Sequence, residues 1–179
     1  MEIIEVRPEG PADFDEVDEV VREAFGSDEE VHLVRAIRRS PGYIPGLALV
    51  AVRAGHVVGH VMVSHASLRG DGDERRVATL SPLAVAAEWQ RRGVGSNLVR
   101  EVARLAEANG EPAVVLEGSP SYYTRFGFEP CDPFGIHIDL PTWATPEAAQ
   151  VLRLSRWDAG LRGRLVFPAL DEVRRQSNA

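Results

Sequence analysis

The chain has 179 residues, of which 44% are hydrophobic, and a formal net charge of −7 at pH 7. This size and composition suit a single domain with a substantial apolar core. The acidic balance argues against nucleic-acid binding, which depends on a basic surface. The single cysteine, Cys131, excludes an intrachain disulfide framework, and no cluster of cysteines and histidines indicates a metal site. Neither a signal peptide nor a membrane span is evident at the start, so a cytoplasmic protein without a membrane partner is expected.

The first part of the chain predicts a strand, two helices and a hairpin. A short strand is expected from Ile3 to Arg7, and apolar residues at helical spacing run from Phe14 to Phe25. Ser27 and Glu30 have the spacing of a capping box that starts a second helix. Two strands joined by a tight turn follow, from Leu47 to Val52 and from Val57 to about Leu68.

The next strand, Val77 to Val85, contains Pro82. Because proline has no N–H to donate to a neighbouring strand, Pro82 is expected at an edge, a bulge or a break. Pairing that loosens there would leave the backbone of Leu83, Ala84 and Val85 facing a gap. These groups could then hydrogen-bond an amide-containing ligand as a neighbouring strand would.

Two glycines, Gly93 and Gly95, lie where strand periodicity changes to helical periodicity. The free amides and the dipole at a helix start make an anion site, to which Arg91 and Arg92 add two guanidinium groups. The helix is expected to close near residue 110. The apolar run from Ala113 to Leu116 then predicts a buried parallel strand, which completes a βαβ unit.

Two other phosphate-binding motifs do not fit this turn. The dinucleotide fingerprint requires a third glycine where Leu98 stands, and the nucleoside-triphosphate loop requires a lysine that this region lacks. Since a G-x-G pair alone is weak evidence, the neighbouring residues must decide which anion is bound.

Those neighbours closely resemble the GNAT superfamily of acetyl-CoA-dependent N-acetyltransferases. The string QRRGVG, Gln90 to Gly95, matches the pattern Q/R-x-x-G-x-G/A, and YTRFGF, Tyr123 to Phe128, matches Y-x-x-x-G-F about thirty residues later. The tail is similar to that of a bacterial branch of predicted acetyltransferases. The resemblance implies an α/β (α+β) fold: a mixed, largely antiparallel sheet with a splayed parallel strand pair, flanked by helices. One N-acetyltransferase domain would span residues 1–179, with its cofactor core at about 77–117.

The resemblance also implies that acetyl-CoA is the acyl donor and which residues bind it. The pantetheine arm would bond the backbone of Leu83, Ala84 and Val85, and the turn would hold the diphosphate. The turn residues are Gln90, Arg91, Arg92, Gly93, Val94, Gly95 and Ser96. Alternatively, Ser96 only satisfies an amide at the helix start, and the two arginines are solvated surface charges.

Three residues are candidates for proton transfer. Tyr123 is the position at which the superfamily often carries a general acid, which would protonate the departing thiolate of coenzyme A. Glu117 and His65 are candidates for the base that deprotonates the amine, with the acidic residues of 72–75 or a water chain as alternatives. Each also has a structural reading: Tyr123 as a core tyrosine, His65 as an ordinary strand histidine and Glu117 as a cap. Tyr122 is assigned to packing.

Strands from about 128–179 are expected to complete the sheet and the acceptor pocket. They are Ile136 to Leu140, Val151 to Leu154 and Arg164 to Phe167. Four tail arginines either orient an acidic acceptor or form a solvated face: Arg153, Arg156, Arg162 and Arg164. Apolar edge strands in the tail are compatible with a homodimer.

The expected function is transfer of an acetyl group from acetyl-CoA to a primary amine of a small molecule or peptide. Direct transfer in a ternary complex is favoured, because Cys131 has no evident base beside it and a small buried residue is the better reading. The alternative is a non-catalytic acyl-CoA-binding sensor or regulatory module. The sequence does not name the acceptor.

Overall fold

The computed structural model describes residues 3–177. Its strands are β1 (Glu5–Pro8), β2 (Ala48–Arg53), β3 (His56–Arg69), β4 (Glu74–Val85), β5 (Ala113–Glu117), β6 (Glu129–Pro130), β7 (Ile136–His137), β8 (Ala149–Arg153) and β9 (Gly163–Val166). Its helices are α1 (Phe14–Phe25), α2 (Glu29–Arg39), α3 (Val94–Ala108), α4 (Pro120–Tyr123) and α5 (Pro168–Ser177).

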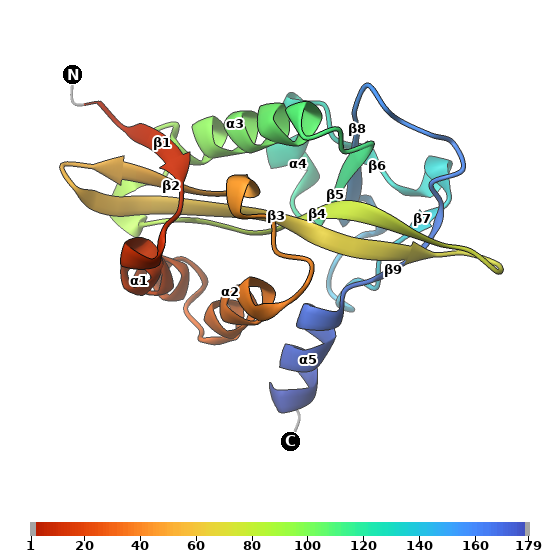
Figure 1. The fold of residues 1–179 in the computed structure, drawn as a ribbon, viewed down its shortest axis with the longest axis horizontal. Helices are drawn as coiled ribbons and strands as arrows, with labels where there is room; N and C mark the ends of the chain where they lie inside the picture. The colour runs from red at the N-terminus through yellow and green to blue at the C-terminus, as the bar shows by residue number, and fades with distance from the viewer. Residues whose placement is uncertain (1–2, 178–179) are drawn as a thin grey trace.

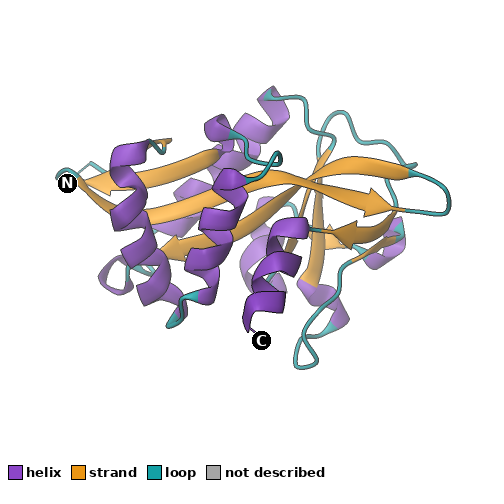
Figure 2. Ribbon diagram, turned by 60° about the horizontal axis from the view of Figure 1, so that its bottom comes forward, coloured by secondary structure: helices purple, strands orange, loops and turns teal. Residues whose placement is uncertain are grey.

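One mixed sheet forms the centre of the fold, with helices on both faces (Figures 1 and 2). Its strand order is β1-β2-β3-β4-β5-β8-β6, and β9 pairs with both β3 and β7. Within residues 3–177 the β4–β5 and β7–β9 pairs are parallel and the other pairs are antiparallel. The expected mixed, largely antiparallel sheet is therefore confirmed.

Each face of the sheet buries its own apolar cluster. Helices α1, α2 and α5 lie on one face and α3 on the other (Figure 1). Because successive side chains of a strand point to opposite faces, Met62 of β3 packs on the α1 side while Val61 and Val63 pack on the α3 side. This alternation decides which residues of β3 and β4 can reach a site on either face.

The sheet splays between β4 and β5, as the proline predicted. Strand β4 pairs with β3 along its length, with an irregularity between Val61 and Val63, close to Pro82. It pairs with β5 only at Ala78 and Thr79. The β5-facing edge of β4 from residue 80 to residue 85 therefore has no strand partner in the described chain, which confirms the gap.

The local structure differs from the sequence expectations in three places. The strand expected over Ile136 to Leu140 ends at His137, because β9 pairs there with β7 at two positions only and then runs along β3. Residues 168–177 form α5, a helix that was not predicted from the sequence, and its Ala169 and Val173 are buried at helical spacing. Asp28, not Ser27, stands at the N-cap position of α2, but its side chain makes no capping hydrogen bond. The Ser27 hydroxyl accepts a hydrogen bond from the Glu29 amide and donates one to the Glu30 carboxylate, so the two residues of the expected capping box do interact.

Candidate active site

Two hollows lie beside the splayed end of β4. The small hollow has a volume of about 340 Å³ and is lined by residues of β4, the glycine turn and α1. The large hollow has a volume of about 860 Å³ and lies between the ends of β4 and β5, α2, α5 and the tail. Phe25, Leu83 and Tyr122 line both. The two hollows therefore adjoin, with the tyrosine and the β4 edge between them.

The glycine turn presents a row of unused amides. Arg91 has φ of 57° and Gly93 has φ of 87°, so the chain passes twice through the left-handed region before α3 begins. In the described chain, none of the amides from Arg91 to Ser96 donates a hydrogen bond to another residue. Such a series of amides at a helix start forms a concave anion site. The Arg91 side chain lines the small hollow, whereas the Arg92 guanidinium lies 5.2 Å from the ring centroid of Trp89.

The free edge of β4 forms the other wall of the small hollow. Leu83 and Val85 line it, while the Ala84 side chain is buried on the opposite side, leaving only its backbone available. The side-chain amide nitrogen of Gln90, Nε2, donates a hydrogen bond of 3.0 Å to the Val85 carbonyl, which fixes the turn against the strand. The Val94 side chain is buried in the α3 cluster, so this residue can contribute only its amide.

Tyr122 closes the small hollow against Gly95. A Cβ atom added at Gly95 would lie 2.6 Å from the Tyr122 hydroxyl oxygen and 3.5 Å from Val85. Only glycine therefore allows this tyrosine to approach the helix start so closely. Although Tyr122 packs on the core as expected, it also lines both hollows. The one feature of the sequence that could have indicated this role is the position of Tyr122 directly before Tyr123 in the motif.

Tyr123 lies deep in the wall of the large hollow. It is 9% exposed, and its ring meets the rings of Tyr122 and Phe128 edge-on at centroid distances of 4.9 Å and 5.6 Å. Burial, with a smaller contribution from Tyr122, raises the pKa of the Tyr123 phenol well above its usual value. The phenol therefore stays protonated at neutral and moderately alkaline pH, as a proton donor must.

The structure brings Glu117 to the large hollow but does not bring His65 there. Glu117 ends β5 at the wall of the hollow, where desolvation raises the pKa of its carboxyl and the charge of Arg174 opposes that rise. His65 projects from β3 toward the α3 side, and its Nε2 lies 2.8 Å from Glu111, just beyond α3. The expectation that His65 deprotonates the amine is therefore not supported, because strand alternation turns its side chain to the other face.

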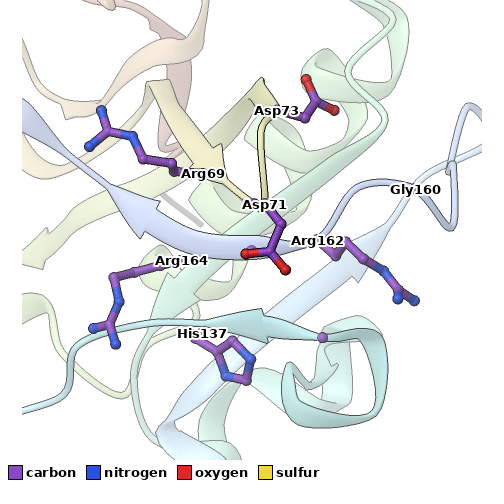
Figure 3. A pocket seen from close by; sticks show the side chains of 10 residues that line it. Arg69, Asp71, Asp73, His137, Gly160, Arg162 and Arg164 are labelled. Carbon is purple, nitrogen blue, oxygen red and sulfur yellow. The ribbon is translucent and has the colours of Figure 1, made fainter.

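Several residues of the large hollow were not expected from the sequence. Phe25 and Trp143 line it while remaining 44% and 81% exposed, and Arg174 of α5 lines it as a cation. The four tail arginines singled out from the sequence do not line it. Two of them, Arg162 and Arg164, line a separate hollow of about 660 Å³ at the β3–β4 loop. In Figure 3, Arg162 extends away from Arg164 there.

Cys131 is buried away from both hollows and is not available as a nucleophile there. The Cys131 side chain is 1% exposed, as expected, and burial raises the pKa of its thiol to about 12. Among the described residues, no group of three or more His, Cys, Asp or Glu side chains is arranged to hold a metal ion. In the same part of the chain, no helix is both long and apolar enough to cross a membrane.

Comparison with known proteins identifies the family. The model of the acetyltransferase (GNAT) domain matches residues 5–131. The uncharacterised N-acetyltransferase YhbS of Escherichia coli is 35% identical over 161 residues, which cover 88% of this chain and 90% of the relative. The uncharacterised N-acetyltransferase YjhQ of the same organism is 36% identical over 120 residues, or 67% of this chain and 66% of YjhQ.

Solved structures agree with this result over nearly the whole chain. The crystal structure of YhbS in complex with CoA superposes with a TM-score of 0.84 at 30% identity, covering 96% of this chain and 93% of that one. A GNAT family acetyltransferase from Brucella melitensis in complex with acetyl-CoA gives a TM-score of 0.76 at 26% identity, covering 96% and 99%. The chain belongs to the GNAT family of acetyltransferases.

Proposed function

We propose that this protein is an N-acetyltransferase that moves an acetyl group from acetyl-CoA to a primary amine of a small molecule or peptide by direct transfer. The observation that carries the proposal is the meeting of two unused sets of backbone groups at one hollow. These are the amides of the turn and the unpaired edge of β4. The first suits a diphosphate, and the second suits the amides of a pantetheine arm.

The residues around the small hollow fit such a ligand. Arg91 to Ser96 would hold the diphosphate through their amides, with the Arg91 guanidinium beside it. Leu83, Ala84 and Val85 would align the pantetheine arm along the strand edge, although the Val85 carbonyl already accepts from Gln90. The absence of a side chain at Gly95 leaves room beside Tyr122. When bound, acetyl-CoA supplies the acetyl thioester as electrophile and coenzyme A as the thiol leaving group.

Glu117 serves as the base for the acceptor amine. A primary amine is mostly protonated at neutral pH, and only its free form is nucleophilic. The Glu117 carboxylate lies in the wall of the large hollow, and its raised pKa makes it a better proton acceptor than an ordinary carboxylate. It takes up the ammonium proton directly or through a water.

Tyr123 donates a proton to the departing sulfur. Its phenol lines the same hollow and stays protonated over the working pH range. The contribution to rate is modest, because a thiolate of pKa near 8.5 leaves readily without full protonation. Direct transfer is favoured over a covalent intermediate on Cys131, because this thiol is buried and its raised pKa keeps it protonated.

Acceptor-dependent release of coenzyme A tests the proposal and separates it from a sensor that only binds acyl-CoA. Binding of acetyl-CoA is measured by calorimetry, and thiol release is measured over polyamines, amino acids, aminoglycosides and peptides. Release that requires an amine, with formation of the acetylated amine, is the expected result. Binding with no acceptor-dependent release across this panel would favour the sensor. Substitution of Gly95 by alanine tests whether the small hollow binds acetyl-CoA in either case.

A further inference from the structure

The large hollow has more negative than positive charge available to a ligand. Among residues 3–177, its carboxylates come from Glu29, Glu30, Glu117 and Asp139, and its one cation is Arg174. Two of the carboxylates are engaged, since Glu30 accepts from the Ser27 hydroxyl and Asp139 pairs with Arg164. In the part of the chain that the structure describes, the carboxylates of Glu29 and Glu117 accept no hydrogen bond. A ligand therefore meets two available carboxylates from different walls, one on α2 and one on β5.

The Thr79 hydroxyl at the floor of the hollow gives a second, independent indication of a polar ligand. Thr79 lines the hollow and is 3% exposed, and its hydroxyl has no hydrogen-bond partner among residues 3–177. Ser64, opposite it in the β3–β4 register, is wholly buried and does not line the hollow. Because a largely buried hydroxyl without a partner is costly, Thr79 indicates that a hydrogen-bonding ligand reaches the floor.

The walls between the polar groups are apolar. They include Leu33, Leu80, Ile138, Leu165, Phe167 and Leu170. At the rim, the exposed rings of Phe25 and Trp143 add aromatic faces. An alkyl chain suits such walls, and an ammonium group is attracted to both carboxylates and aromatic rings. The Thr79 hydroxyl oxygen on the floor can also accept a hydrogen bond from an amine.

We infer that the acceptor is a small alkyl diamine or polyamine: one amine is acetylated beside Glu117 while a second ammonium is held by Glu29. This inference rests on the proposed function. A monoamine of equal length would fill the apolar walls but leave Glu29 unused. An amino acid would bring a carboxylate toward Glu29, and the lone Arg174, which already faces Glu117, would have to compensate for that repulsion.

The test compares kcat/KM for three matched series of acceptors with saturating acetyl-CoA. These are α,ω-diaminoalkanes, alkylamines of the same length, and ω-amino acids in which a carboxylate replaces the second amine. We expect the diamines to exceed the alkylamines by up to about fivefold and the ω-amino acids by more, because Glu29 is exposed and an exposed charge pair contributes about 1 kcal/mol or less. The preference should shrink as salt is raised, since screening weakens that attraction.

Glu29→Gln assigns the preference to a residue. It should remove most of the preference, which lowers the ratio of diamine to alkylamine kcat/KM by up to about fivefold, mainly through KM. Glu19→Gln is the matched control, because Glu19 is an exposed carboxylate of α1 that does not line the hollow, and it should leave the ratio unchanged. Equal use of alkylamines or ω-amino acids, or an unchanged ratio in Glu29→Gln, would overturn the inference and leave the proposed function standing. No thiol release with any amine would overturn both.

Discussion

Substitution of Gly95 by alanine tests the geometry of the small hollow. The added Cβ would lie 2.6 Å from the Tyr122 hydroxyl oxygen. Ordinary contact begins near 3.4 Å, so the hydroxyl must retreat by about 0.8 Å, or the methyl group must crowd the hollow itself. Overpacking of this kind costs roughly 1–3 kcal/mol. If about 1.4 kcal/mol of that cost falls on the bound state, acetyl-CoA affinity decreases about tenfold.

The stability of this variant should change less than its affinity, because a gain in helix propensity offsets part of the overpacking cost. Gly95 lies in the first turn of α3 without a left-handed φ, and alanine is favoured over glycine in a helix by about 1 kcal/mol. Gly93→Ala is the contrasting control. A Cβ there meets nothing within 4 Å, but φ of 87° makes alanine strained, so stability should fall by about 1–2 kcal/mol. Urea unfolding measures both effects, and calorimetry measures the dissociation constant of acetyl-CoA.

Tyr122→Phe in the Gly95→Ala background separates the two sources of crowding. Removal of the Tyr122 hydroxyl oxygen removes the atom nearest to the added Cβ, so the affinity for acetyl-CoA should recover toward that of Tyr122→Phe alone. Wild-type affinity in Gly95→Ala would refute the assignment of this hollow to acetyl-CoA. A double variant that binds no better than Gly95→Ala would show that contact with Tyr122 is not the cause.

Three further predictions concern proton transfer and stability. Tyr123→Phe should lower kcat about 10- to 100-fold with little change in KM, and an unchanged kcat would show that Tyr123 is not the acid. Because burial raises the pKa of this phenol, the wild-type activity should persist well into alkaline pH. Wild-type kcat/KM should fall as pH decreases through the raised pKa of Glu117, and Glu117→Gln should lose this acid limb of the pH profile. His65→Gln should change kcat by no more than about twofold, because His65 pairs with Glu111 on the α3 face of the sheet. Glu9→Gln should destabilise the fold by about 3 kcal/mol, since Arg38, Tyr43 and His60 all contact this buried carboxylate. Burial alone would raise the pKa of Glu9, but hydrogen bonds from His60 and Arg38 lower it to about 2, so its contribution is complete above the unfolded value near 4.5 and is lost as pH falls toward 2. Urea unfolding at pH 7 and at lower pH should therefore show the difference between Glu9→Gln and wild type shrinking.

The splayed sheet and the glycine turn could be predicted because local chemistry decides them. Pro82 cannot donate to a ladder, and the register does become irregular beside it while β5 pairs only with residues before it. Gly93 and Gly95 stand where strand periodicity becomes helical, and α3 begins between them. Periodicity also predicted both early helices and the hairpin, since each buries a face of its own.

Features that depend on distant parts of the chain could not be predicted. Whether His65 faces Glu117 or Glu111 depends on which face of the sheet α3 covers, and no local pattern states this. Tyr122 reaches Gly95 because α4 is placed by β5, and Arg174 reaches the large hollow because α5 folds back beside α2. The alternation over residues 136–140 predicted too long a strand. Alternating apolar residues indicate that one side of a segment is buried, but a strand also needs a neighbouring strand to pair with, and β9 pairs with only two of these residues.

Initial-rate measurement of thiol release with and without an amine tests the central claim most directly. With acetyl-CoA and a diamine both varied, coenzyme A should be released only when the amine is present, in equal amount to the acetylated amine, as direct transfer requires. A burst of coenzyme A before the amine is added would contradict direct transfer. Tight binding of acetyl-CoA with no amine-dependent release across the panel would contradict the assignment of an N-acetyltransferase.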